Sequence, residues 1–345
     1  MKRQRDDVDK IIKKDLLRYL STTMSLTMNN RIEQLDFLKC VFIIHVIMIH
    51  LVPLGHDFPW LKEFFLLYTT PVFFVISGFL AHVDKPAPVF FHKVLWWFIP
   101  YAIMESGYIV MAAILPINEH IAQLTPSVFL SKLFLSPLGP YWYIHNLIIS
   151  YVVYYGAHYL YRSYARWTGI LLGAVSIFVF VFWLGIVSLH CLLFFSLGIV
   201  IKHSKVSFLT IFRPNLVWLL AAIVLAFAYQ HLPYHDVFCG LLTSVWLSYV
   251  MTTLWLLIER CLPQAVRLVS FVIGKNTLAI LLFSPAFTIV TKRFVPFLAF
   301  DPTDILFTLV SVAFTVGGCL LTAKAMDLLG ISPYFCGKPR FYCRK

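Results

Sequence analysis

Long apolar segments follow one another along almost the whole chain, and short polar segments separate them. A helix that crosses a lipid bilayer needs roughly 20 mainly apolar residues. Windows of about this length recur ten times. The pattern predicts spans at Phe37–Leu54, Phe64–Val83, Val94–Leu115, Tyr141–Leu160, Thr168–Leu184, Val187–Ile201, Leu216–Leu232, Phe238–Ile258, Thr277–Val290 and Ile305–Leu329. We therefore expect an all-α, polytopic membrane protein with about ten transmembrane helices.

Three of these windows need a comment, because two come from dividing a longer apolar run and the ninth is short. The run from Thr168 to Ile201 is too long for one span, so we divide it into a tight hairpin at Gly185. The ninth window is short, and the stretch QAVRLVSFVIGKN before it predicts an interfacial segment that is broken at Gly274.

The two ends of the chain differ from the apolar middle. The first 18 residues contain seven basic side chains with leucines and isoleucines between them, which is typical of an amphipathic helix lying on the inner leaflet. No apolar core of a signal peptide accompanies these charges. We divide the chain into a cytosolic basic segment (1–30), a transmembrane domain (31–330) and a basic cytosolic tail (331–345).

The distribution of basic residues indicates an orientation. With the N-terminus inside, the cytosolic segments collect 23 of the 28 Lys and Arg residues, and Lys39 lies within the first span. The outer loops receive Lys62, Lys132, Lys292 and Arg293. This asymmetry follows the positive-inside rule and predicts both termini in the cytosol of a plasma membrane protein.

Composition narrows the function classes. The chain is 60% hydrophobic and 13% charged, with a mean hydropathy of +0.82, which excludes an ordinary soluble domain. The net charge of +12 is spread over short loops and tails, so it indicates membrane topology and not a nucleic-acid partner. The seven cysteines show no metal-ligand spacing, and we expect neither a metal site nor a structural disulfide.

Chemistry is concentrated in the first span, LDFLKCVFIIHVIMIHL. A charged side chain inside a bilayer costs roughly 2.5–3.5 kcal/mol, which makes an intramembrane ionisable group a functional candidate. Eleven residues turn a helix by about 1100°, close to three full turns, so Lys39 and His50 share one face. Asp36 lies about 40° from His50, whereas His45 points about 140° away, which predicts a hydrogen-bonded packing role for His45.

Simpler explanations exist for both residues of this stripe. Lys39 lies about one turn inside the span, from which its ammonium can snorkel to the inner interface. His50 lies near the outer end, where it can contact lipid headgroups. Asp36 either pairs with Lys39 or Arg31, or caps the start of the helix.

Five segments, in order along the chain, resemble motifs of the membrane-bound acyltransferase-3 family. RIEQLDFLKCVFIIHVIMIH resembles its opening helix, in which a basic residue is followed after ten residues by His. TTPVFFVISGFL, HKVLWWFIPYA, GPYWYIHNLII and IGKNTLAILLFSP resemble the later motifs. Two departures concern the binding site: Trp96 and Trp97 stand where arginines are common, leaving Lys93 and His92, and Ser284 stands where the family usually has His before Pro285.

The resemblance implies transfer of an acyl group, commonly acetyl, from cytosolic acyl-CoA to a hydroxyl of a cell-surface or lipid-linked glycan. Acyl-CoA would act as a co-substrate and no cofactor would be bound permanently. His50 is then expected to be the general base, because a neutral imidazole can accept the hydroxyl proton. Lys39 is expected to stabilise the anionic donor or the oxyanion. Candidate supporting residues are Arg31, Asp36, Lys93 and Glu105.

Other polar groups are ranked below this pair. Glu105, in the third span, is expected to pair with a basic residue or to stay protonated. Ser77 is more readily explained by close helix packing beside Gly78 than by nucleophilic catalysis. Candidate residues lining a cavity are Ser77, Trp142, His145 and Asn146, although interfacial positions also explain the last three.

Two other function classes remain open at this point. A transporter or flippase of a sugar or lipid-linked substrate would also need many spans and intramembrane polar groups, but no internal repeat is evident. A membrane scaffold without catalytic activity would not need Lys39 and His50 on one face. The expected partners are membrane lipids and the glycan acceptor, and no oligomeric state follows from the sequence.

Overall fold

The structure is a computed structural model that describes residues 32–51, 58–114, 119–161, 188–204, 206–213 and 237–343, with isolated residues in the gaps from 162 to 187 and from 214 to 236. Arg31 and the predicted segment 1–30 lie outside the described residues. Within the described ranges the regular structure is entirely helical, without a strand. The all-α prediction is confirmed.

Eight predicted spans coincide with described helices. These are α2 (Glu33–Ile49), α4 (Pro59–Phe79), α5 (Ala87–Ile114), α7 (Trp142–Tyr161), α9 (Leu189–His203), α12 (Val237–Cys261), α14 (Thr277–Thr291) and α16 (Ile305–Leu328). Shorter elements join them: α6 (Pro126–Phe134), η1 (Gly139–Tyr141), α10 (Phe208–Ile211), α13 (Gln264–Lys275), η3 (Lys292–Phe294), α15 (Val295–Leu298) and α17 (Ser332–Cys336).

The structure does not confirm the number of ten spans. Five described helical segments are long and apolar enough to cross a membrane: Pro59–Phe79, Ala87–Ile114, Gly240–Cys261, Thr277–Leu298 and Ile305–Leu328. Helix α2 has 17 residues and α9 has 15, which are short for a bilayer. The predicted spans at 168–184 and 216–232 lie largely outside the described residues.

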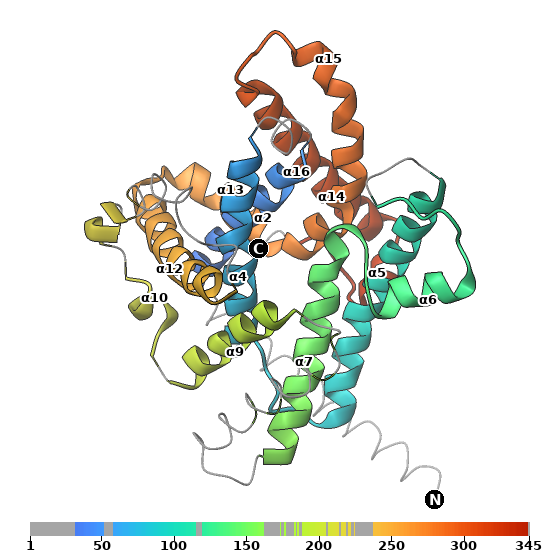
Figure 1. Cartoon of the computed structure of the whole chain (residues 1–345), viewed down its shortest axis with the longest axis vertical. Coiled ribbons are helices and arrows are strands. Elements are labelled where there is room, and N and C mark those ends of the chain that lie inside the picture. Colours follow the sequence, from blue (N-terminus) through green and yellow to red (C-terminus); the bar gives the residue numbers. More distant parts are fainter. Residues whose placement is uncertain are drawn as a thin grey trace, which may run out of the picture.

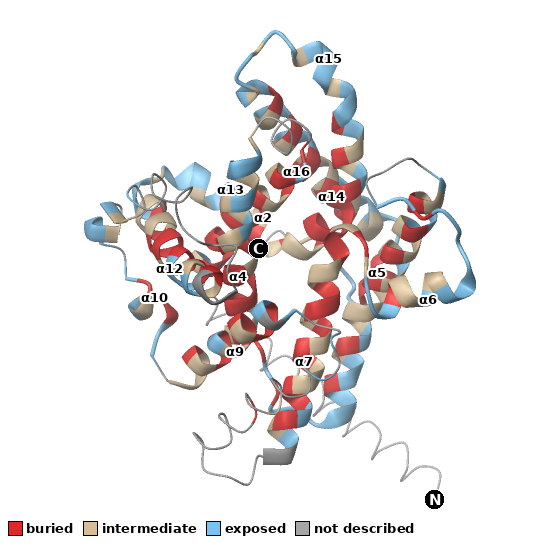
Figure 2. Cartoon of the chain, viewed as in Figure 1, coloured by how far each residue is buried: buried red, intermediate tan, exposed pale blue. Residues whose placement is uncertain are grey.

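Helix α2 lies at the centre of the fold, where it contacts α4, α12, α13, α14 and α16 (Figure 1). Its apolar side chains explain this position, since Leu38, Phe42 and Ile47 are almost completely buried. Figure 2 shows that burial is concentrated on the sides of the helices that face this centre. A helix surrounded by other helices on most sides needs apolar residues on most of its surface. Two polar residues of α2, Asp36 and His45, are buried by the surrounding helices.

Glycines allow the closest helix contacts. A Cβ atom on Gly78 of α4 would lie 2.0 Å from the carbonyl oxygen of Phe195 in α9, and one on Gly198 would lie 2.1 Å from the carbonyl oxygen of Val75. A Cβ atom on Gly274 of α13 would lie 1.8 Å from the carbonyl oxygen of Asp36. Helix α13 continues through Gly274 to Lys275, so the predicted break at Gly274 is wrong. This glycine serves the contact between α13 and α2.

Helices α5 and α7 pack side by side through aromatic side chains (Figure 1). The rings of Phe90 in α5 and Tyr155 in α7 are stacked with centroids 3.8 Å apart. Aromatic side chains bury large apolar areas when they pack together in this way. The pair fixes α5 against α7 near the start of α5.

The C-terminal segment packs against the transmembrane domain. The Asn276 amide donates a hydrogen bond to the Cys343 carbonyl at 2.9 Å and accepts one from the Cys343 amide at 2.8 Å. Gly337 lies against Trp96 of α5. Residues 331–343, predicted as a separate tail, are therefore joined to α5 and to the start of α14 by specific contacts.

Candidate active site

A cavity of about 790 Å³ lies between α2, α4, α5, α7 and α14. Lysines line it at both ends, and apolar side chains line its middle. Its lysines are Lys39, Lys62, Lys93, Lys275 and Lys292, and Glu119 is the acidic residue among the described lining residues. The volume lies within the range of small-molecule sites, which is about 300–1,000 Å³. A cavity with this excess of positive charge suits an anionic ligand.

One face of α2 forms a wall of the cavity. Lys39, Ile43, Ile47 and His50 all line it, and they follow one another at intervals of three or four residues. This spacing places successive side chains on one helix face. Lys39 and His50 therefore reach the same cavity, separated by about 16 Å along the helix axis.

His45 lies on a different side of α2, as its predicted angle requires. The ring stacks on Phe65 with centroids 4.5 Å apart, and its Nδ1 atom lies 3.3 Å from the hydroxyl oxygen of Tyr68. His45 is 7% exposed and is not among the lining residues of the cavity. The prediction that His45 is a hydrogen-bonded packing residue is confirmed.

Asp36 holds Lys39 in place. Its Oδ1 atom lies 2.6 Å from the Lys39 Nζ atom, and the two side chains are 2% and 20% exposed. Helix α2 begins at Glu33 after Ile32, and no side chain caps it, so the capping role considered for Asp36 is not observed. Arg31, the other partner considered, lies outside the described residues. The pair fixes one cation at the cavity wall, one turn into the helix.

His50 ends α2 as its C-cap residue, and its backbone N–H bonds to Ile47. The side chain faces the cavity, and no hydrogen bond to the imidazole occurs among the described residues. Lys62, from the first turn of α4, lies close enough for its charge to act on this ring. The imidazole of His50 is thus part of the cavity wall.

Lys93 of α5 lies at the other end of the cavity, against aromatic rings. Its Nζ atom lies 4.8 Å from the ring centre of Trp97, 5.1 Å from that of Tyr151 and 3.4 Å from the Tyr151 hydroxyl. A cation over a ring is attracted by the negative π-face. Trp97, one of the two departures from the family pattern, thus supports Lys93, whereas Trp96 bonds to His92 and packs on Gly337.

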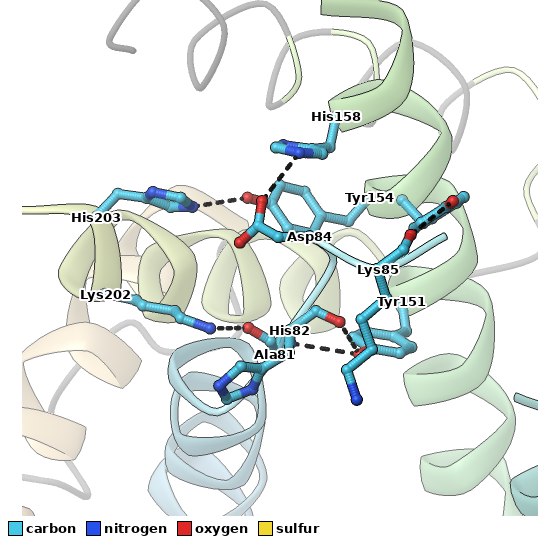
Figure 3. A network of polar contacts seen from close by, with 10 residues as sticks. Ala81, His82, Asp84, Lys85, Tyr151, Tyr154, His158, Lys202 and His203 are labelled. Carbon is cyan, nitrogen blue, oxygen red and sulfur yellow. Dashed lines mark hydrogen bonds and ion pairs between the residues drawn. The ribbon is translucent and has the colours of Figure 1, made fainter. Parts of the chain in front are cut away.

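Leu80 and Ala81, at the start of the connection between α4 and α5, line the cavity, and Figure 3 shows the polar contacts of this connection. Side chains of α7 and α9 hold its backbone: Lys202 donates to the Ala81 carbonyl, Tyr151 to the His82 carbonyl and Tyr155 to the Lys85 carbonyl. His158 Nε2 lies 3.2 Å from Asp84 Oδ1. Four of the five residues from 81 to 85 are therefore held by two neighbouring helices.

Further positive charge surrounds Lys93. Lys85, Lys202 and Lys338 lie close enough for their charges to act on it. Burial and the neighbouring Lys202 ammonium lower the pKa of the His82 imidazole, which leaves this ring neutral at pH 7. The positive potential at this end thus comes from lysines, and it suits a ligand that carries several negative charges.

Four predicted cavity residues divide into two pairs. Ser77 and Trp142 line the cavity, and the Ser77 Oγ atom lies 3.1 Å from the Tyr143 hydroxyl oxygen. His145 and Asn146 are not lining residues: His145 Nε2 lies 2.8 Å from the Phe134 carbonyl oxygen, and the Asn146 side chain bonds the backbone of Trp142 and Ser188. Both side chains therefore form their hydrogen bonds with backbone groups of the protein.

Glu105 is completely buried but does not line the cavity. Its Oε1 atom accepts a hydrogen bond from the Leu138 amide at 2.7 Å, and Oε2 has no hydrogen-bond partner among the described residues. The predicted ion pair with a basic residue is not found within the described part of the chain. Glu105 fixes the loop that precedes η1, and two η1 residues, Gly139 and Pro140, line the cavity.

Several lining residues were missed in the sequence. Lys275 lies in the quoted motif IGKNTLAILLFSP, so the motif itself carried a signal. Lys62 and Lys292 were counted as topology signals of outer loops. Ser284, the second departure from the family pattern, also lines the cavity beside Pro285. Hydropathy alone carried no signal that these side chains share one space.

Residues 32–324 match the family described as an acyltransferase domain, which covers most of the chain and the whole described lining of the cavity. A search of curated proteins found no match, and neither did a search of solved structures. The chain therefore belongs to the acyltransferase-3 family of membrane acyltransferases.

Proposed function

We propose that this acyltransferase moves an acyl group, with acetyl as the default, from cytosolic acyl-CoA to a hydroxyl of a cell-surface or lipid-linked glycan. One observation carries the proposal. A single helix face brings an ion-paired cation, Lys39, and an imidazole, His50, to the same cavity. Charge distribution in the sequence supports an orientation with the Lys93 end toward the cytosol of a plasma membrane.

The distance along α2 divides the roles of the two residues. A rise of about 16 Å prevents Lys39 from contacting an oxyanion that forms at His50. We therefore assign Lys39 to the donor phosphates, together with Lys93 and Lys275, and not to the oxyanion. The pantetheine arm of an acyl-CoA is an extended chain of comparable length. It would place the thioester near His50 while the nucleotide stays among the lysines.

The chemistry at His50 is a general-base step. A ring nitrogen accepts the proton of the acceptor hydroxyl as its oxygen attacks the thioester carbonyl carbon. The tetrahedral intermediate collapses, the carbon–sulfur bond breaks, and the imidazolium returns the proton to the departing thiolate. General-base catalysis contributes about 10²- to 10⁴-fold to the rate. The products are an ester and a free thiol, so the reaction needs no other reactant.

Cells that produce the wild-type protein or the His50→Ala variant provide the test. Ester-linked acyl groups on surface glycans are measured by mass spectrometry, with Asn215→Ala as a control in a residue that does not line the cavity. The proposal predicts acylation with the wild type and the control, and its loss with His50→Ala. Equal acylation with both variants would exclude His50 as the base. Glycan transport without any acylation would instead favour the transporter hypothesis.

A further inference from the structure

The end of the cavity at His50 carries two lysines for which the catalytic step has no role. Lys62 comes from the first turn of α4, and Lys292 follows the last residue of α14. No ion pair involves either ammonium group within the described residues. Both positions lie far along the cavity from the donor lysines Lys39 and Lys93.

Helix electrostatics distinguishes the two lysines. Partial positive charge at a helix N-terminus disfavours a cation in the first turn, by about 0.3–1 kcal/mol. Lys62 occupies such a position, so local stability does not explain its presence in the cavity wall. A cation at a helix C-terminus is favoured, which partly explains Lys292. Lys62 is therefore the stronger indication of a ligand.

Little negative charge balances these lysines within the cavity. Glu119 is the acidic residue among the described lining residues, and its Oε2 atom accepts a hydrogen bond from the Gly139 amide at 2.7 Å. That bond holds the carboxylate at the first residue of η1. An anionic group brought by a ligand would provide the missing charge, and charge-assisted hydrogen bonds from ammonium groups are stronger than neutral ones.

We infer that the acceptor is anionic and that Lys62, assisted by Lys292, binds its phosphate or carboxylate group while His50 deprotonates a neighbouring hydroxyl. This inference rests on the proposed acyl transfer and narrows its acceptor class. A phosphate would belong to a lipid-linked saccharide, and a carboxylate to an acidic sugar. A neutral acceptor with the same hydroxyl would lack this contact and bind more weakly.

The test compares three acceptors with the full-length protein in lipid nanodiscs: a polyprenyl-diphosphate-linked oligosaccharide, a uronate-containing oligosaccharide and a neutral oligosaccharide. Transfer of a radiolabelled acetyl group from acetyl-CoA gives kcat/KM for each. The wild type should prefer at least one anionic acceptor over the neutral one by about tenfold to a hundredfold, the range expected of a hydrogen bond to a charged group. The preferred acceptor distinguishes phosphate from carboxylate.

Variants assign the preference to the two lysines. Lys62→Gln should reduce the ratio of anionic to neutral kcat/KM to near one through a higher KM, and Lys62→Arg should retain most of it. Lys292→Gln should reduce the ratio less. Lys132→Gln and Arg293→Gln are the controls, because both carry the same charge but do not line the cavity, and they should leave the ratio unchanged.

Salt provides a measurement that needs no variant. The preference of the wild type for an anionic acceptor should decrease as ionic strength rises, because salt screens charge interactions at an open cavity.

Transfer to all three acceptors with equal efficiency would overturn the inference but leave the acyltransferase proposal intact. A preference for an anionic acceptor that persists in the Lys62→Gln variant would also overturn the inference and leave the acyltransferase proposal intact. Absence of transfer to any acceptor would instead contradict the proposed function itself.

Discussion

Asp36 and Lys39 form an ion pair at the wall of the cavity, and the pair gives the first testable prediction at the scale of single residues. Asp36→Asn removes the negative partner and leaves the Lys39 ammonium in a mostly apolar environment. Breaking a fully buried pair costs roughly 3–5 kcal/mol, and we expect about 2 kcal/mol because Lys39 is partly exposed. Thermal unfolding in detergent measures this loss.

The matched control is Glu33→Gln, in the same first turn of α2 but exposed. It should change stability by less than about 0.5 kcal/mol, as surface substitutions usually do. The KM for acyl-CoA should rise with Asp36→Asn and stay constant with Glu33→Gln. Equal stability and equal KM for both variants would show that the pair does not hold Lys39.

His50 gives a prediction about pH. Protonation removes the lone pair with which the imidazole accepts the hydroxyl proton. The single-turnover rate of acyl transfer should therefore fall as pH is lowered from about 6.5, the ordinary pKa of an imidazole, toward about 4, because burial and the nearby Lys62 ammonium disfavour protonation of the ring at higher pH. The residual rate of His50→Gln should lack this dependence, since an amide does not titrate in that range. A flat profile for the wild type under single-turnover conditions would exclude a histidine base.

At the scale of helices, the contact between α4 and α9 shapes the cavity. Gly78→Ala would place a Cβ atom 2.0 Å from the Phe195 carbonyl oxygen, so one helix must shift. Overpacking typically costs about 1–3 kcal/mol, and we expect the melting temperature in detergent to fall. Because Phe195 and Ser77 both line the cavity, acyl transfer should decrease as well.

Gly107→Ala is the control for this prediction. Gly107 lies in α5, and a Cβ atom there would meet no atom within 4 Å. Alanine is favoured over glycine in a helix by about 0.5–1 kcal/mol, so this variant should be as stable as the wild type or slightly more stable. If both variants have the same melting temperature, the close contact between α4 and α9 is not needed.

The sequence predicted helices well because hydropathy reports where a chain can contact lipid or a packed core. It predicted the shared face of Lys39 and His50 because the helical repeat is a local property. It failed for contacts between distant segments. The amide that binds Glu105 belongs to Leu138, 33 residues away, and the carbonyl that binds His145 belongs to the end of α6. Neither partner follows from periodicity.

Lys62 and Lys292 illustrate a related limit of sequence reasoning. The positive-inside rule assigns a residue to one side of a membrane but does not predict which face of a helix its side chain occupies. Both lysines were therefore counted as loop charges, although both face the cavity. The short helix α13 illustrates the same limit, because Gly274 was interpreted as a break and instead allows the contact with α2.

At the scale of the whole molecule, one cavity joins two groups of lysines, and His50 lies with the second group. Lys39, Lys93 and Lys275 line one end, and His50 and Lys62 line the other. A donor and an acceptor that enter from opposite ends would meet beside His50. In the proposed reaction, the described helices of the acyltransferase domain would hold both substrates in this one cavity.

The most direct test measures acyl transfer across a membrane. Protein reconstituted in one orientation in vesicles receives radiolabelled acetyl-CoA on the side of the Lys93 end and an acceptor glycan on the other side. The account predicts ester-linked label on the acceptor, with a single-turnover rate about 10²- to 10⁴-fold lower for His50→Ala. Transfer by His50→Ala at the wild-type rate, or label that reaches the acceptor side only as intact acetyl-CoA, would contradict it.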